Sequence, residues 1–250
     1  MNQDIIIPAE PGRADFMRVQ QALESMGLGS NFIVNQADLR LEEVLTADKN
    51  QYEFSLYENS ASDRKLERKL NRNDLFFLTH IAVCLTKQDA GAEDYGNYQL
   101  FTHPDPNFFV GVSGGNKEYQ SLLNVYNGQL SISTEPVERL SGFLTNNFLY
   151  IPEKPYLNAS SPQVEELGMY GPTDEARGYF RLNPNLILDG NDQNKISLRL
   201  GKGNKAVIAG GVDASGDAVD TSNVLVILAK GFVAKNAAQK MGRWTGQKAY

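Results

Sequence analysis

A series of short strand-like runs, spread over residues 39–234, constrains the fold of this 250-residue chain more than any other feature. At 39–41 and 52–56, apolar residues alternate with polar ones, the pattern of a strand with one face in water. Comparable runs follow at 130–132, 179–188 and 196–200. Many short strands separated by turn residues predict an all-β fold, either a sandwich or a barrel.

Two runs are longer, and both of their alternating faces are apolar. They cover residues 74–86 and 224–234. In the first run, simple alternation predicts two faces, with Leu75, Phe77, Ile81, Val83 and Leu85 on one and Phe76, Leu78, Ala82 and Cys84 on the other. A strand of this kind is covered on both sides or lies in an interface between subunits.

One amphipathic helix precedes the strands. Its apolar residues recur at helical spacing between Pro11 and Gly27, and Gly27 is placed to end it. Two roles are open for this helix, either covering a face or edge of the β domain or reaching a neighbouring subunit. The residues that would make the contact are Phe16, Val19, Leu23 and Met26.

Composition excludes several classes of protein. The net charge of -6 and the pI near 5.1 argue against a surface that binds nucleic acid over its whole extent. Cys84 is the only cysteine, so no internal disulfide can form, and its apolar run predicts a buried, inert thiol. The first residues lack the features of a secretory signal and no run suits a membrane span, so we expect synthesis in a host cytoplasm.

No catalytic constellation is expected. The two histidines, His80 and His103, and the single cysteine are too few for most catalytic triads and zinc sites. Residues 201–206 match a dinucleotide-binding fingerprint, but no helix follows them, so a hairpin turn is favoured. We therefore expect no enzyme activity, no cofactor and no metal. A glycosidase with two facing carboxylates is the third hypothesis, behind two non-enzymatic ones.

The end of the chain forms a basic tail over residues 237–250. All charged side chains after Asp220 are positive, and two aromatic residues offer anchors. A solvated tail is one interpretation. The other is an arm that binds a neighbouring subunit, with an acidic surface or nucleic acid as the charge partner. The residues proposed for this arm are Lys240, Arg243, Trp244, Lys248 and Tyr250.

The order of helix, charged connection, long two-faced strand, Pro-rich loop and late long strand resembles the jelly-roll capsid proteins of viruses and bacteriophages. The residues that carry this resemblance are 39–41, 52–56, 74–86, 130–132, 148–151, 179–188, 196–200 and 224–234. The resemblance implies eight main strands in two packed sheets, with termini that reach across to neighbouring subunits.

This resemblance gives a definite expectation for the fold. We expect a jelly-roll-like antiparallel β-sandwich over 36–236, an N-terminal helical arm over 1–35 and a C-terminal arm over 237–250. The alternative is two small jelly rolls in tandem. By the family analogy that arrangement would need about sixteen strands, and the sequence offers only about twelve.

The expected function follows from the same resemblance. It is a virion structural protein, a capsid subunit whose partners are identical subunits in a symmetric assembly, with other virion proteins as further partners. The alternative is a carbohydrate- or receptor-binding sandwich of the phage fibre or baseplate type. That module would need an exposed aromatic platform, for which Tyr95, Tyr98, Phe108 and Phe109 are the candidates.

Overall fold

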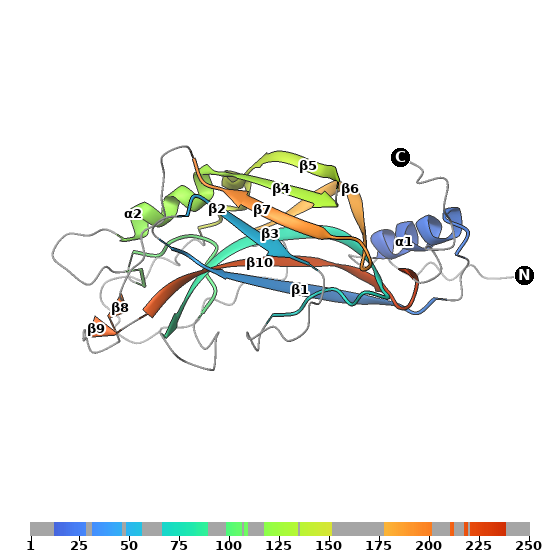
Figure 1. Ribbon diagram of the computed structural model, residues 1–250, viewed down its shortest axis with the longest axis horizontal. Helices are drawn as coiled ribbons and strands as arrows, with labels where there is room; N and C mark the ends of the chain where they lie inside the picture. The colour runs from blue at the N-terminus through green and yellow to red at the C-terminus, as the bar shows by residue number, and fades with distance from the viewer. Residues whose placement is uncertain are drawn as a thin grey trace, which may run out of the picture.

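Two β-sheets form the body of the molecule in the computed structural model (Figure 1). The structure describes residues 13–28, 32–46, 49–56, 67–89, 99–106, 108–109, 118–134, 136–151, 178–201, 211–212, 218–219 and 221–238. Helix α1 (Arg13–Ser25) lies at one end of the sandwich, and the short helix α2 (Glu118–Leu122) lies at the opposite end.

Each sheet contains four antiparallel strands. The first has the order β1-β10-β3-β6, and the second has the order β2-β7-β4-β5. The strands of the first sheet are β1 (Val34–Val44), β3 (Leu75–Asp89), β6 (Tyr179–Asp189) and β10 (Thr221–Ala234). Those of the second are β2 (Gln51–Ser55), β4 (Gln129–Thr134), β5 (Val137–Leu144) and β7 (Asn194–Arg199). A small ribbon adds β8 (Gly211–Val212) and β9 (Ala218–Val219).

The pairing of early strands with late strands identifies the topology. Among the eight strands of the two large sheets, the first pairs with the last, the second with the seventh, the third with the sixth, and the fourth with the fifth. A long antiparallel ribbon rolled into two sheets produces this order, which is that of a jelly roll. The predicted fold class is confirmed. Because each sheet mixes strands from both halves of the chain, these eight strands form one sandwich and not two in tandem.

The hydrophobic core lies between the two sheets. Both contribute fully buried side chains to it, including Leu41 of β1, Tyr52 of β2 and Leu130 of β4. Alternation along each strand directs one face into this layer, as the sequence pattern predicts. The two long strands β3 and β10 are neighbours at the centre of their sheet, so their second faces point away from the core.

A bulge at Thr79 corrects the predicted faces of β3. His80 pairs with Lys230 and Leu78 pairs with Gly231, so Thr79 is an extra residue in β3 at this point. Its hydroxyl donates a hydrogen bond to the carbonyl of Lys230 at 3.0 Å. An extra residue reverses the alternation beyond it. The core face is therefore Phe76, Leu78, Ile81, Val83 and Leu85, and the outer face is Leu75, Phe77, His80, Ala82 and Cys84.

The strand predicted at 148–151 is wrong. A 3-10 helix, η2 (Thr145–Phe148), occupies the start of this segment, and residues 149–151 form no strand. The strand that completes the sheet is β5, which the sequence pattern missed. β5 lies at the edge of its sheet and most of its side chains are exposed or half-buried, so its sequence lacks the apolar alternation that marks inner strands. Ahead of β4, the short helix α2 is followed directly by the 3-10 helix η1 (Leu123–Asn127).

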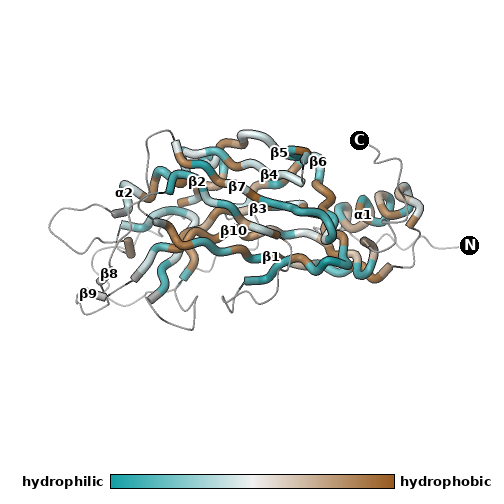
Figure 2. The backbone as a smooth tube through the Cα atoms, viewed as in Figure 1, coloured by the Kyte–Doolittle hydropathy of each residue, from teal (hydrophilic) through white to brown (hydrophobic). Residues whose placement is uncertain are grey.

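Helix α1 ends as its sequence predicts. Gly27 has a positive φ of 71°, and its N–H donates to the carbonyl of Glu24 at 2.9 Å. The N–H of Leu28 donates to the carbonyl of Leu23 at 3.0 Å, so the last turn is a Schellman motif. Hydrophobic and hydrophilic segments alternate along the helix (Figure 2). The cap and the alternation together give one helix with one apolar face.

Candidate assembly surface

The apolar face of α1 packs on the chain's own sandwich. Val19 and Leu23 are buried against Leu75, Phe77 and the alanines that follow β10, and Met26 packs at the margin of this cluster. The ring of Phe16 lies 6.0 Å from that of Phe232 between centroids. All four predicted contact residues of the helix therefore cover the outer face of the sheet β1-β10-β3-β6. This is the first of the two roles that the sequence leaves open.

Beyond the helix, four polar side chains cross the outer face of the same sheet in one row. Asp38 pairs with Lys230, Lys230 with His80, and His80 with Arg181, so the row runs over all four strands. Asp38 and Arg181 are exposed, whereas Lys230 and His80 are half-buried. We call this row the polar strip. It separates the part of the sheet under α1 from the apolar part at the other end.

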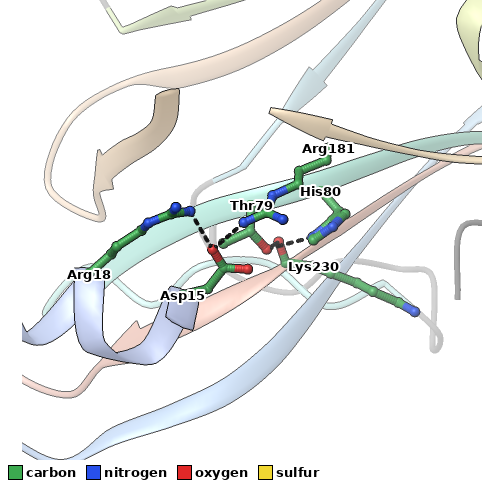
Figure 3. A network of polar contacts seen from close by, with 6 residues as sticks. All are labelled: Asp15, Arg18, Thr79, His80, Arg181 and Lys230. Carbon is green, nitrogen blue, oxygen red and sulfur yellow. Dashed lines mark hydrogen bonds and ion pairs between the residues drawn. The ribbon is translucent and has the colours of Figure 1, made fainter. Parts of the chain in front are cut away.

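An ion pair connects the helix to the polar strip (Figure 3). Oδ1 of Asp15 lies 2.7 Å from Nη2 of Arg181 and 3.1 Å from Nη1 of Arg18. Asp15 is only 7% exposed. The sequence contains a signal for this contact, because Asp15, Val19 and Leu23 follow each other at intervals of four on one helix face. A buried acidic residue on an apolar face calls for a charged or hydrogen-bonding partner, and only the fold identifies it as Arg181.

The remaining contacts of the strip satisfy its half-buried groups. His80 Nδ1 lies 2.9 Å from the hydroxyl oxygen of Thr79. Nζ of Lys230 lies 3.9 Å from the centre of the Tyr179 ring, a cation–π contact. Burial raises the pKa of Tyr179, with smaller contributions from Cys84 and Asp38, so its phenol stays protonated and neutral at physiological pH.

At its far end the outer face is apolar and buried. Ala82 and Cys84 of β3 form a cluster with Val224 and Val226 of β10. Burial raises the pKa of Cys84 to about 12, so its sulfur is held as an unreactive thiol. This confirms the predicted burial of Cys84. Both faces of the central strands are therefore covered along most of their length.

Several exposed apolar side chains lie close together in the chain around β5 and η2. Leu144 at the end of β5 is 54% exposed, and Ile151 just after η2 is 64% exposed. Leu149 between them and Val137 at the start of β5 are also exposed. We call Leu144, Leu149 and Ile151 the η2 patch. The sequence does not signal this patch. Its pattern predicts a strand at 148–151, whereas the three apolar residues, at spacings of five and two, fit no single strand face.

The aromatic platform predicted for a carbohydrate-binding module does not form from Phe108 and Phe109. Phe109 is fully buried in the core, and Phe108 packs against the same cluster. The ring centroids of Phe101 and Phe108 are 4.6 Å apart, and those of Phe108 and Phe109 are 4.9 Å apart. Tyr95 and Tyr98 lie outside the described residues. The two phenylalanines thus contribute to folding and present no flat exposed surface to a sugar.

Two further properties of the described part of the chain, its metal-ligating groups and the length of its helices, bear on the kind of site. No group of three or more His, Cys, Asp or Glu side chains there is arranged to hold a metal ion. His103 has an aspartate neighbour, with Nε2 3.6 Å from Oδ2 of Asp105. None of the helices in these ranges has the length and hydropathy needed to cross a membrane.

The proposed arm residues Lys240, Arg243, Trp244, Lys248 and Tyr250 lie outside the described residues, as do most residues of the tail at 237–250. Ala237 and Ala238, at its start, are buried beside α1. No family model, curated protein or solved structure matches the chain. The fold and the η2 patch are therefore the features of the molecule that bear on its function.

Proposed function

We propose that this chain is a structural subunit of a virion that assembles with identical copies into a capsid through its surface. The observation that carries the proposal is the η2 patch at the end of the edge strand β5. Ile151 and Leu144 are each more than half exposed, and the exposed Leu149 lies between them in the chain. Apolar residues grouped in this way on a folded surface mark sites of protein association.

The architecture supports the same conclusion. A jelly roll is a scaffold that capsid proteins share with lectins and cupins, so the fold narrows the choice of function without making it. Lectin-type recognition needs exposed aromatic rings, and Phe108 and Phe109 are used inside the core. Self-association needs an exposed apolar patch on a rigid element, and η2 supplies one because Thr145 and Phe148 anchor it in the core.

The position of the patch suits repeated contacts between copies. η2 follows an edge strand, so the patch lies at a margin of the sandwich, where a neighbour can approach without disturbing either sheet. Identical subunits that associate through such a patch and a complementary surface on the neighbour form closed symmetric assemblies where the rotation between copies closes. The helix α1 packs its apolar face on its own sandwich, so the proposal assigns the contact with the neighbour to the η2 patch.

The experiment is size-exclusion chromatography with light scattering on the full chain, followed by electron microscopy. We expect particles far larger than 27.7 kDa. Leu144→Asp combined with Ile151→Asp should yield folded monomers, because a charge at each position opposes burial in an interface. Ile33→Asp is the matched control, since Ile33 is 67% exposed but lies just before β1 of the other sheet, and it should leave assembly intact. A wild-type protein that remains a monodisperse monomer at high concentration would refute the proposal.

A further inference from the structure

A buried lysine and a buried asparagine face each other across the two central strands. Lys87 of β3 is 4% exposed and Asn223 of β10 is fully buried. The register of the β3–β10 ladder places them directly opposite each other. Directly opposed residues on antiparallel strands have Cβ atoms about 4.5–5.5 Å apart. The Lys87 side chain is therefore long enough to bring its amine to the amide carbon of Asn223.

Both side chains point into the layer between the sheets. Leu85 and Leu225 lie two residues along their strands from Lys87 and Asn223, and both leucines belong to the central core. Positions two apart share a face of the sheet. Nζ of Lys87 lies 5.6 Å from the ring centres of both Phe108 and Phe109. The amine thus lies beside two phenyl rings in a place from which bulk water is excluded.

A carboxyl group on β1, the strand on the other side of β10, completes the arrangement. Glu43 of β1 pairs with Leu225, so it lies diagonally across from Asn223 on the same face. Diagonal neighbours are about 7–8 Å apart, which long side chains can bridge. Glu43 is half-buried, and it lies two residues from Leu41 and Leu45, which both belong to the central core. The amine, the amide and the carboxyl therefore occupy nearby positions on β3, β10 and β1, three strands that lie side by side in the sheet.

We propose that Lys87 and Asn223 become joined by an isopeptide bond once the chain has folded. The neutral amine of Lys87 attacks Cγ of Asn223, and a bond forms between Nζ and Cγ. Glu43 accepts a proton from Nζ and delivers a proton to the amide nitrogen of Asn223. The bond between Cγ and Nδ2 then breaks and one ammonia leaves. The product is a secondary amide, and the step requires no oxidant, reductant or cofactor.

The fold meets the needs of this reaction in a specific way. Attack by an amine on an unactivated amide is slow in water, and it becomes feasible when the two groups are held together in a dry site. The attacking amine must be neutral, because an ammonium has no lone pair and cannot act as a nucleophile. The link would tie the third strand of the jelly roll to the last one, across 135 intervening residues. It would give a chain with a single cysteine a covalent closure that disulfides cannot provide.

The test is the intact mass of the purified full chain. We expect a deficit of about 17 Da against the sequence mass, because one ammonia is lost. A succinimide would give the same deficit, so a tryptic digest must also contain one branched peptide in which residue 87 is attached to residue 223. An unmodified mass, or a deficit without the branched peptide, would overturn the proposal. Because the wild-type protein is measured, this test does not depend on the folding of any variant.

Variants then test the roles of the individual residues. Lys87→Met should have its full sequence mass, since the nucleophile is gone. Glu43→Gln should also have its full sequence mass while circular dichroism shows a folded protein, because the proton carrier is lost. Glu53→Gln, an exposed glutamate on β2, is the matched control and should keep the deficit. A Glu43→Gln protein that still contains the branched peptide would overturn the role of Glu43. None of these results depends on whether the chain forms capsids.

Discussion

Replacement of Asp74 by alanine should release the end of β10 from the start of β3. Asp74 is 3% exposed, and its carboxylate accepts two hydrogen bonds from the residues just after β10. The backbone N–H of Asn236 donates to Oδ1 at 2.9 Å, and Nζ of Lys235 donates to Oδ2 at 2.7 Å. Asn236 has a left-handed φ of 56°, a conformation in which asparagine is enriched among non-glycine residues, and the carboxylate ties this turn to the start of β3.

The two contacts contribute unequally. A hydrogen bond from a backbone N–H to a buried carboxylate is worth about 1.5–3 kcal/mol. The Lys235 side chain is 48% exposed, so its ion pair contributes only about 0.2–1 kcal/mol. Asp74→Ala should therefore lower the free energy of unfolding by about 2–4 kcal/mol. Lys235→Met, which removes only the ion pair, should lower it by less than about 1 kcal/mol.

Urea unfolding followed by fluorescence at low protein concentration measures both values. With a slope of about 3 kcal/mol per molar urea, Asp74→Ala should move the midpoint down by about 1 M and Lys235→Met by less than about 0.3 M. Equal shifts for the two variants would refute the reasoning, because the bond to Asn236 would then contribute nothing. A shift for Asp74→Ala within the error of the wild type would refute it as well.

Three further predictions concern packing and ionisation. Gly231→Ala should prevent stable folding, because a Cβ there would lie 2.0 Å from the carbonyl oxygen of Phe77. Gly142 has open space around it, so Gly142→Ala should lower the free energy of unfolding by only about 1–2 kcal/mol, the cost of its positive φ. Thermal unfolding measures both variants. Leu23→Ala should cost about 2–5 kcal/mol by urea unfolding and detach α1, whereas Met17→Ala, at a half-exposed position, should cost less than about 0.5 kcal/mol. Because burial raises the pKa of Cys84 to about 12, the unfolded chain releases this proton at lower pH than the folded one. Stability should therefore fall by up to about 1.4 kcal/mol per pH unit above pH ~9, and Cys84→Ala should remove that slope between about pH 9 and 10. A slope that is the same in both proteins would contradict the assignment.

Local sequence patterns predicted those elements whose signals are contained within a few residues. The apolar stripe of α1 and the glycine that ends it are both local, and the helix ends as expected. The alternation at 52–56 and 196–200 likewise predicted β2 and β7, because these strands have one face in the core. β5 was missed because an edge strand buries little and its sequence has no need of strict alternation.

The candidate sites depended on the tertiary structure to a greater degree. Asp15 is visible in the sequence as an acid on an apolar helix face, but its partner Arg181 lies 166 residues away. Lys87 and Asn223 look like ordinary polar residues at the ends of two apolar runs. Only the register between β3 and β10 places them opposite each other, since no local pattern encodes which residue of a distant strand lies alongside.

The sequence by itself determined that this chain forms an all-β fold with one preceding helix, because alternation, turn residues and the apolar stripe of the helix are properties of consecutive residues. The tertiary structure decided which strands pair and which side chains face the core. One extra residue at Thr79 exchanged the two faces of β3, and pairing of the first strand with the last turned a series of strands into a jelly roll. Both outcomes depend on contacts between residues far apart in the chain, where burial and hydrogen bonding over the whole sheet outweigh any local preference.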